Sequence, residues 1–548
     1  MQDRKFKILV IRFSSLGDII LTTPVLDALK ENYRNSEICF LTRQRYQGLL
    51  EADPRISSVI YFQPEDRDRG IAGLFRLTKL LNQEKFDLIV DLHSNFRSFF
   101  IRNLVRAQKK VRYDKKLLSR LQMIYFKKWK TNSVSTVESY LNSLKKVDII
   151  SQHKIPKLFV KSEDRLWAER FLSEVRFKRE ELLIGIAPGA RWEMKKWGKD
   201  KFSFLAKSLN QDLPAKILLV GDENDQNLIE DIKDYTGEDR AIPAVNLSLN
   251  KLLPLIEKCE LFISNDSGPM HLASALGVPA IGIFGPTSPS LGFTPSGLKD
   301  KIFWKGVECS PCSLHGKKRC VREKRFCMDE IMAEEVLEES KRITNADKVI
   351  FLDRDGTLTV EKDFVSEVEQ VKFLPNTTKG LKILQGLGYK LVIVSNQSGI
   401  GRKIMTEKQV EEINDFILEQ LENEGIQIQG IYFCPHHPED DCNCRKPRTG
   451  LIGKALLKHN LKLKDSWVIG DKLSDVLLGK NIRTKSILVL TGYGEEVRKK
   501  IESGSEILPW QKPDYIARDI LDAALYIESQ ISKKKARKVI NSRLIKEE

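Results

Sequence analysis

Two aspartates, Asp353 and Asp355, follow the apolar run VIFL within the segment DRDGT. Side chains at positions i and i+2 of an extended segment point the same way, so both carboxylates can address one group. One carboxylate could attack phosphorus while the other handles the proton on the leaving oxygen. Two acids this close repel each other and need a cation, and carboxylates favour Mg²⁺. The segment predicts magnesium-dependent phosphoryl chemistry.

Three further motifs each follow a strand-like run. They are Ser395-Asn396-Gln397 after KLVIVSN, Arg445-Lys446 before Pro447, and Asp471 with Asp475 after SWVIG. The hydroxyl and amides can bind phosphoryl oxygens, the cations can stabilise the transferred group, and the two acids can supply further metal oxygens. Because ligands collect at the carboxyl ends of parallel strands, these motifs are expected to share one site.

This order of motifs resembles the haloacid-dehalogenase superfamily of aspartyl-phosphate phosphatases. The resemblance implies that Asp353 is the nucleophile and that Asp355 is the general acid and base. It also implies an Mg²⁺ site formed by Asp353, a backbone oxygen of Asp355, and Asp471. Ser395 and Lys446 would steady the phosphoryl group.

The segment CPHHPEDDCNCRKP contains two pairs of metal-binding side chains at i, i+2 spacing, namely Cys434 with His436 and Cys442 with Cys444. Four such ligands predict a closed tetrahedral Zn²⁺ site. Its expected role is structural, because it lies next to Arg445-Lys446 and would pin the loop that carries them. His437 could replace His436, and spacing alone leaves this open.

Together, DRDGT and the Cys/His loop resemble the D-glycero-D-manno-heptose 1,7-bisphosphate 7-phosphatases and, nearly as well, the histidinol-phosphate phosphatases. The resemblance implies substrate contacts from Glu361, Lys362, Asp363, Phe364, Asn396, Gln397, Ser398, Arg445 and Lys472. The short loop between His436 and Cys442 leaves the substrate and the preferred anomer open.

A second set of polar residues lies in the first half of the chain. The strand-like run KILVIRF leads to Asp18, which could act as a base or simply cap the following helix. Lys195, Lys196 and Lys199 follow LLIGIAPG, a plausible diphosphate site. The segment DSGPMH, residues 266–271, follows ELFISN at an expected helix start, where backbone amides attract a diphosphate.

These segments resemble the ADP-heptose:lipopolysaccharide heptosyltransferases, an inverting family with two Rossmann-like domains. The resemblance covers nearly all of residues 5–335. It implies that Asp18 is the base on the acceptor hydroxyl and that Lys196 binds the donor phosphates. Asp266, Ser267, Gly268 and His271 would contact the nucleotide-sugar, ADP-heptose. The acceptor would be a phosphorylated inner-core glycolipid at the inner membrane surface.

The elements that must position these residues recur in three blocks of short apolar runs alternating with amphipathic stretches. This alternation predicts an α/β fold with three doubly wound parallel-sheet domains. Two would be the Rossmann-like domains of the transferase, residues 1–170 and 171–340. The third would be a haloacid-dehalogenase-like domain, residues 346–530, followed by a basic tail, residues 531–548.

The chain has 548 residues and a net charge of +16, which favours an anionic partner. Residues 101–130 hold eleven Lys or Arg and one acid, interleaved with aromatic and aliphatic residues. This is typical either of a solvated face or of a helix lying on an acidic membrane. Since no signal peptide and no membrane-spanning run is recognisable, we expect a cytoplasmic protein at the cytoplasmic face of the inner membrane. No motif for binding nucleic acid accompanies the charge.

The sequence therefore predicts a bifunctional enzyme of lipopolysaccharide heptose metabolism that uses Mg²⁺ and structural Zn²⁺. Two alternatives stay open: a phosphatase acting on histidinol phosphate, and a non-catalytic basic adaptor for membrane or nucleic acid. A second cysteine group also has no assigned ligand. It comprises Cys309, Cys312, Cys320 and Cys327.

Overall fold

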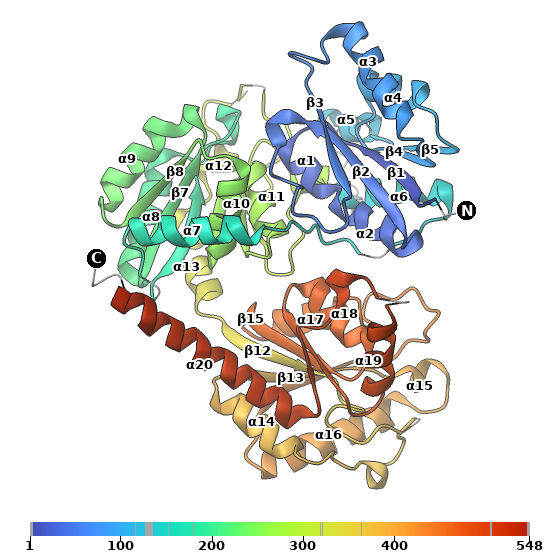
Figure 1. Ribbon diagram of the computed structural model, residues 1–548. Helices are drawn as coiled ribbons and strands as arrows, with labels where there is room; N and C mark the ends of the chain where they lie inside the picture. The colour runs from blue at the N-terminus through green and yellow to red at the C-terminus, as the bar shows by residue number, and fades with distance from the viewer. Residues whose placement is uncertain are drawn as a thin grey trace. The chain divides into compact units, whose positions relative to one another are not determined.

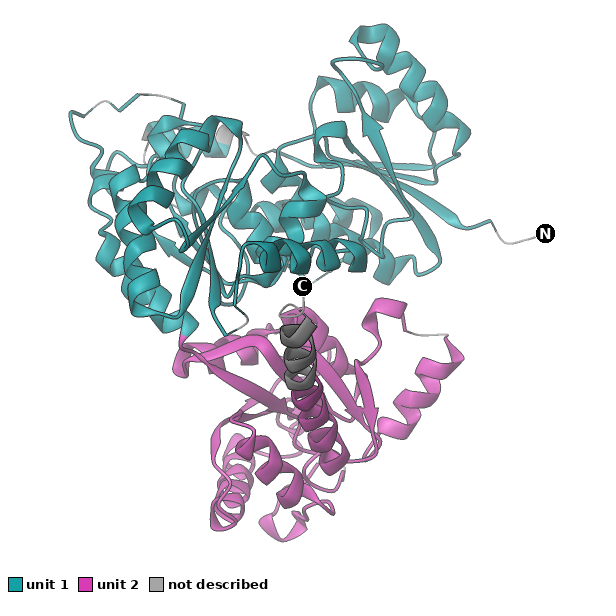
Figure 2. Ribbon diagram, turned by 60° about the vertical axis from the view of Figure 1, so that its left-hand side comes forward, with its two compact units in different colours: residues 1–344 teal, residues 345–548 magenta. Residues whose placement is uncertain are grey.

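The computed structural model describes residues 4–115, 117–126, 135–151, 153–178, 180–317, 319–320, 322–362, 364–504 and 507–544. The chain divides into two compact units, Met1–Thr344 and Asn345–Glu548 (Figure 2). The first unit contains two parallel sheets and the second contains one (Figure 1). Three parallel sheets in alternation with helices confirm the predicted fold class.

The first sheet has the order β3-β2-β1-β4-β5. Its strands are β1 (Phe6–Ile11), β2 (Ser36–Arg43), β3 (Ser58–Phe62), β4 (Leu88–Asp91) and β5 (Lys109–Arg112). Its helices are α1 (Leu16–Leu21), α2 (Thr23–Asn32), α3 (Gly70–Gln83), α4 (Phe96–Leu104), α5 (Leu117–Phe126) and α6 (Thr136–Leu144). The run ILVI of β1 is fully buried because helices cover both faces of this central strand.

The second sheet has the order β11-β10-β9-β6-β7-β8. Its strands are β6 (Leu182–Ala187), β7 (Ala215–Gly221), β8 (Ala241–Val245), β9 (Leu261–Asn265), β10 (Ala280–Ile283) and β11 (Lys301–Phe303). Its helices are α7 (Ser162–Glu174), α8 (Lys199–Asp212), α9 (Gln226–Thr236), α10 (Leu249–Lys258), α11 (Gly268–Ala275), α12 (Phe326–Asp329) and α13 (Ala333–Thr344). Ion pairs from Arg165 to Glu257 and from Lys258 to Glu169 join α7 to α10, so residue 170 falls inside a helix that packs on this second half.

The third sheet has the order β14-β13-β12-β15-β16-β17. Its strands are β12 (Asp347–Leu352), β13 (Lys390–Asn396), β14 (Ile428–Cys434), β15 (Leu461–Gly470), β16 (Lys485–Val489) and β17 (Tyr515–Ala517). Its helices are α14 (Thr377–Gly386), α15 (Ser398–Gly401), α16 (Glu407–Asn423), α17 (Gly450–Lys458), α18 (Leu473–Ile482), α19 (Gly494–Ser503) and α20 (Ile520–Leu544). Leu352 of β12 lies opposite Ile393 of β13 and Ile469 of β15, so the ends of three neighbouring strands meet at one edge.

The cations of residues 101–130 are spread over several elements. Within residues 101–130 the chain completes α4, forms edge strand β5 and then forms α5, so no single helix carries the charge; residues 127–134 lie outside the described part. The segment after residue 530 continues α20 to Leu544. Among the described helices, none is long and apolar enough to cross a membrane.

Candidate active sites

The cluster at the end of β12 is built around a buried lysine. The Nζ atom of Lys446 lies 2.7 Å from Oδ1 of Asp353 and 2.6 Å from Oδ1 of Asp475. It also donates to the carbonyl of Val394 at 2.8 Å. Burial alone would lower the pKa of Lys446, but the two carboxylates outweigh it and raise the pKa. The lysine therefore presents a fixed positive charge to whatever Asp353 contacts.

The carboxylates outnumber this cation. Asp353, Asp471 and Asp475 are all buried, and each offers an oxygen within 4.8 Å of the others. Burial, followed by the charges of Asp353 and Asp475, raises the pKa of Asp471 to about 8. Its Oδ1 is buried and has no hydrogen-bond partner among the described residues. Oxygen ligands with excess negative charge and an unsatisfied carboxylate oxygen fit a divalent cation.

Two glycines outside the predicted site shape this pocket around Asp471. A Cβ at Gly356 or at Gly492 would lie 2.2 Å from Oδ2 of Asp471, and both glycines have positive φ. Neither position tolerates a side chain while the carboxylate keeps its place. Gly356 is the glycine of DRDGT, a signal that was available in the sequence, whereas nothing local marks Gly492.

The predicted acid, Asp355, is held by a partner that sequence reasoning missed. The buried Arg354 guanidinium forms a two-pronged ion pair with it, with Nε 3.0 Å from Oδ1 and Nη2 2.8 Å from Oδ2. Burial favours the protonated form of Asp355, but Arg354 and further hydrogen bonds outweigh it, and the pKa is lowered. In this arrangement Asp355 is an ionised carboxylate.

The amides after β13 have structural contacts of their own. Gln397 Nε2 donates to Oδ2 of Asp355 at 2.9 Å and to the hydroxyl of Ser395 at 2.6 Å. The backbone N–H of Lys446 donates to Asn396 Oδ1 at 2.9 Å. Asn396 therefore joins the end of β13 to the loop that carries Lys446.

The predicted substrate residues differ in their contacts and exposure. Lys472 Nζ lies 2.9 Å from Glu361 Oε2, which joins the segment after β12 to the end of β15. Phe364 is half-exposed and lies beside Gly399 of α15, the helix that Ser398 begins. Arg445 has a buried Nη1 with no hydrogen-bond partner in the described part of the chain. Lys362 is exposed, and Asp363 lies outside the described residues.

The four metal-ligand candidates of the Cys/His loop converge. Cys434 Sγ lies 3.6 Å from His436 Nδ1 and 3.6 Å from Cys442 Sγ, and Cys444 Sγ lies 3.3 Å from Cys434 Sγ. Such spacings suit a tetrahedral ion bound at thiolate and imidazole distances. His437 instead has its Nδ1 3.3 Å from the backbone nitrogen of Glu439, so the geometry selects His436.

In the first unit, Asp18 lies at the start of α1 and performs two tasks. Its Oδ2 accepts hydrogen bonds from the backbone and hydroxyl of Ser15 at 3.1 and 2.8 Å, which caps the helix. The same oxygen lies 2.8 Å from Nη2 of buried Arg12. Burial would raise the pKa of Asp18, but Arg12 and Ser15 outweigh it and lower the pKa. Asp18 therefore caps the helix, as one of the two interpretations predicted. The carboxylate is also ionised and is held in place by Arg12, which the motif did not indicate.

The segments that contain Asp18 and His271 meet. A Cβ on Gly17 would lie 2.7 Å from Cδ2 of His271, and one on Gly268 would lie 2.9 Å from Cδ2 of Leu16. Only glycine permits this close approach of α1 to α11. The fold thus brings the predicted base and the predicted nucleotide-sugar segment to one place.

Lys195 and Lys196, which follow β6, form ion pairs with different acids. Lys195 Nζ lies 2.6 Å from Asp266 Oδ2, and Thr287 donates to the same oxygen at 2.5 Å. Lys196 instead pairs with Glu193 at 2.9 Å. Lys195, which the sequence grouped with Lys196 and Lys199 as a plausible diphosphate site, is therefore the lysine in contact with the predicted nucleotide-sugar segment.

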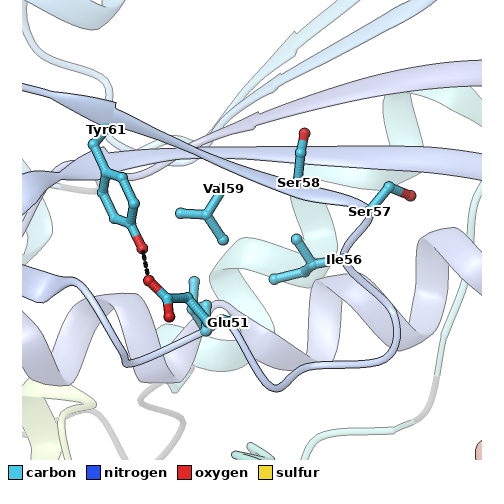
Figure 3. A pocket seen from close by; sticks show the side chains of 7 residues that line it. Glu51, Ile56, Ser57, Ser58, Val59 and Tyr61 are labelled. Atoms are coloured by element: carbon cyan, nitrogen blue, oxygen red, sulfur yellow. Dashed lines mark hydrogen bonds between the residues drawn. The ribbon is translucent and has the colours of Figure 1, made fainter. Parts of the chain in front are cut away.

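Two other features contain none of the predicted site residues. A hollow of about 230 Å³ lies beside β3 and is lined by Glu51, Tyr61 and neighbouring residues, with Tyr61 donating to Glu51 at 2.7 Å (Figure 3). The cysteines of the second group lie near one another, because burial and then the charges of Cys309, Cys312 and Cys320 raise the pKa of the Cys327 thiol to about 12.

Residues 348–479 match the family model described as polynucleotide kinase 3 phosphatase, and residues 443–523 match one described as HAD-hydrolase-like. A D-glycero-beta-D-manno-heptose-1,7-bisphosphate 7-phosphatase of Helicobacter pylori is 44% identical over 147 residues, which are 27% of this chain and 85% of that protein. One from Haemophilus ducreyi is 35% identical over 188 residues, covering 33% of this chain and 98% of that protein. The chain belongs to the family of these heptose-bisphosphate phosphatases. Residues 345–548 are hereafter the phosphatase unit.

The first unit matches a second family. Residues 74–322 match the model described as glycosyltransferase family 9 (heptosyltransferase). A solved glycosyltransferase family 9 structure from Veillonella parvula covers 63% of this chain and 98% of its own, with 22% identity and a TM-score of 0.54, and so shows the same fold. Residues 1–344 are hereafter the transferase unit. One chain thus combines a glycosyltransferase with a phosphatase, as the sequence predicted.

Proposed function

We propose that this chain is a bifunctional enzyme of lipopolysaccharide inner-core heptose metabolism. The transferase unit moves heptose from ADP-heptose to a core glycolipid, and the phosphatase unit removes the 7-phosphate of heptose 1,7-bisphosphate. The observation that carries the proposal is the coincidence of two heptose-related families in one chain, each with its predicted catalytic aspartate held beside a buried cation.

In the phosphatase unit, Oδ1 of Asp353 is held by Lys446 and by the backbone N–H of Arg354 at 2.8 Å. We assign the attack on phosphorus to Oδ2. The bound phosphate monoester monoanion first gives its proton to Asp355, which is ionised in the free site. A bond then forms from Oδ2 to phosphorus, the bond from phosphorus to the sugar oxygen breaks, and the sugar oxygen takes that proton from Asp355. Water then attacks the aspartyl phosphate, loses a proton to Asp355 and releases inorganic phosphate.

The residues that would hold the divalent cation are Asp353, Asp471 and the backbone oxygen of Asp355, with Asp475 beside them. Bound there, Mg²⁺ would supply charge neutralisation for the attacked phosphoryl group. The Cys434 group would hold Zn²⁺, which would keep Arg445 and Lys446 in place without entering the reaction.

In the transferase unit, Asp18 would remove the proton of the acceptor hydroxyl. The acceptor oxygen would then attack the anomeric carbon, while the bond from that carbon to the diphosphate breaks and ADP leaves. The amides at the start of α11 and the lysines after β6 would carry the charge of the diphosphate. A single direct displacement inverts the anomeric configuration.

The two reactions are not consecutive. The phosphatase product would keep its 1-phosphate, whereas the transferase donor is a nucleotide-diphosphate sugar, so a nucleotidyl transfer must come between them. We therefore propose co-localisation at the cytoplasmic face of the inner membrane, where the acceptor glycolipid is held, rather than direct transfer of product between the sites.

The decisive experiment measures phosphate release with Mg²⁺ from heptose 1,7-bisphosphate and from histidinol phosphate, and heptose transfer from ADP-heptose. The expected result is a strong preference for the heptose substrate, lost in Asp353→Asn while transfer persists. A preference for histidinol phosphate would separate the phosphatase from the transferase pathway. Full phosphatase activity in Asp353→Asn would refute the aspartyl-phosphate mechanism.

A further inference from the structure

Large apolar side chains gather on the outer surface of α3 and α4. Six of the eighteen exposed large hydrophobic residues in the described chain lie between positions 71 and 104. They form what we call the α3–α4 face and comprise Ile71, Phe75, Leu80, Phe96, Phe99 and Leu104. The most exposed, Phe96, has 71% of its surface accessible. Single exposed apolar residues are ordinary, but a cluster marks an interaction surface.

The face belongs to two helices that are firmly placed. Asn82 near the end of α3 donates to the carbonyl of Leu104 at 3.2 Å and accepts from the backbone N–H of Arg106 at 2.7 Å. The rings of Phe75 and Phe100 meet edge to face at 5.0 Å between centroids. Figure 1 shows the two helices side by side.

A different side of each helix packs against the core. Leu74, Leu77 and Leu81 of α3 and Ile101 of α4 are buried in one cluster under the first sheet. Between residues 71 and 80 the exposed positions of α3 are 71, 72, 75, 76, 79 and 80, on the opposite side of that helix. The apolar outer face is therefore additional to what folding needs.

Cations flank the α4 side of the face. From residue 92 to residue 113 the chain has six Arg or Lys and no Asp or Glu. Exposed Lys109, Lys110 and Arg112 lie on edge strand β5, and Lys110 Nζ donates to the carbonyl of Asn103 in α4 at 3.2 Å. Aromatic side chains beside a band of single-sign positive charge match an anionic lipid surface.

The face also lies at the functional edge of its sheet. Helix α4 begins at Phe96, three residues after His93, which follows β4 at the carboxyl edge. Arg12 connects this segment to the predicted base, because its Nη1 donates to the carbonyl of Leu92 at 2.6 Å and its Nη2 lies 2.8 Å from Oδ2 of Asp18. A surface that begins here would bring Asp18 toward a membrane-held acceptor.

We propose that the α3–α4 face docks on an anionic lipid membrane, with Phe96 and Phe99 entering the interface and the cations of α4 and β5 contacting lipid phosphates. Pairing with a second copy through the same face is disfavoured, because it would oppose two bands of positive charge. The proposal deepens the proposed transferase function, but vesicle binding can be measured without any sugar substrate, so the two can fail separately.

The test uses the full chain and flotation with vesicles of phosphatidylethanolamine and phosphatidylglycerol, against vesicles of phosphatidylcholine alone. We expect binding to the anionic vesicles that weakens as salt rises. Phe96→Ser and Phe99→Ser should each weaken it by about tenfold, because an aromatic side chain no longer leaves water. Lys109→Glu with Lys110→Glu should weaken binding to anionic vesicles by a similar factor.

The matched control is Leu457→Ser, which removes an even more exposed leucine, 86% accessible, from α17 of the phosphatase unit. It should leave binding unchanged, and unaltered thermal unfolding of both units in calorimetry will show that each variant is folded. Equal vesicle binding by wild type, Phe96→Ser and Phe99→Ser would overturn the proposal. So would a dimer in sedimentation that the two Phe variants dissociate, since a second copy would then be the occupant.

Discussion

Asp353 and Asp18 both lie beyond the carboxyl end of a central strand, Asp353 directly after β12 and Asp18 in the helix that follows β1. Each follows a central parallel strand and lies within 2.8 Å of a buried cation, Lys446 for Asp353 and Arg12 for Asp18. Asp353, however, lies in a group of three buried acids, whereas the cluster around Asp18 pairs a single carboxylate with a guanidinium.

The two sites differ in whether the protein itself balances the charge of the carboxylates. Buried acids that outnumber the neighbouring cations need a further bound cation or bound protons to be stable. The raised pKa of Asp471 reflects this excess of negative charge. A carboxylate with its own arginine has no such requirement. The comparison predicts that one unit depends on a metal ion and that the other does not.

The largest effect is expected for Asp353→Asn. The amide keeps the shape but cannot attack phosphorus, so phosphate release should fall by at least about a thousandfold. Heptose transfer should be unchanged, and single-turnover assays of both reactions on one preparation check this. Parallel loss of both activities would mean that the two sites are not independent.

The next largest effect is expected when divalent cations are removed, because only the phosphatase activity should depend on them. After chelation, phosphate release should be lost and should return with Mg²⁺, while heptose transfer stays within about twofold of its original rate. Isothermal titration should detect Mg²⁺ binding that is lost in Asp471→Asn. Metal-independent phosphate release would contradict the interpretation of the buried acids.

Asp18→Asn is the reciprocal variant. Loss of the base should lower heptose transfer by about a hundredfold to ten-thousandfold, the usual range for general base catalysis. Because an amide can still accept the hydrogen bonds from Ser15, the helix cap and the melting temperature should change little. A large drop in stability with unaltered transfer would show that Asp18 only caps the helix.

Cys434→Ser should act on the phosphatase unit through stability. Without a complete ligand set the loop that carries Lys446 loses its anchor, so the melting temperature of this unit should fall by about 5 °C or more and bound zinc should be lost. Metal analysis and calorimetry check this. Cys39→Ser in the transferase unit is the control and should leave zinc content unchanged.

The smallest effect is a change in pH dependence. The lowered pKa of Asp18 keeps it ionised, so base function is present above that pKa and is lost as pH falls through it. Arg12→Met removes the main stabilising charge, raises the pKa and should move the acid limb of kcat/KM for heptose transfer to higher pH, with about a tenfold loss near neutrality. Arg12→Lys should restore most of the profile.

Much of both sites could be predicted because strand-end motifs are local. Asp353, Ser395 and Asp471 each follow a run of apolar β-formers, and parallel pairing necessarily brings such ends to one edge. The Cys434 group could be predicted equally well, since its ligands lie within eleven residues. The structure of residues 101–130 was harder to predict, because their pattern is typical either of a solvated face or of a helix on a membrane, whereas β5 pairs with β4 and takes part of that charge into a sheet edge.

The sequence by itself determined the fold class, the two families and the identity of the acidic and cysteine clusters, since each depends on residue type and short-range order. The tertiary structure decided which neighbour each group contacts: His436 rather than His437 at the cysteines, Lys195 at Asp266, Arg12 at Asp18 and Gly492 at Asp471. These choices depend on backbone paths and burial that bring distant segments within a few ångströms, and no local pattern of residues encodes such distances.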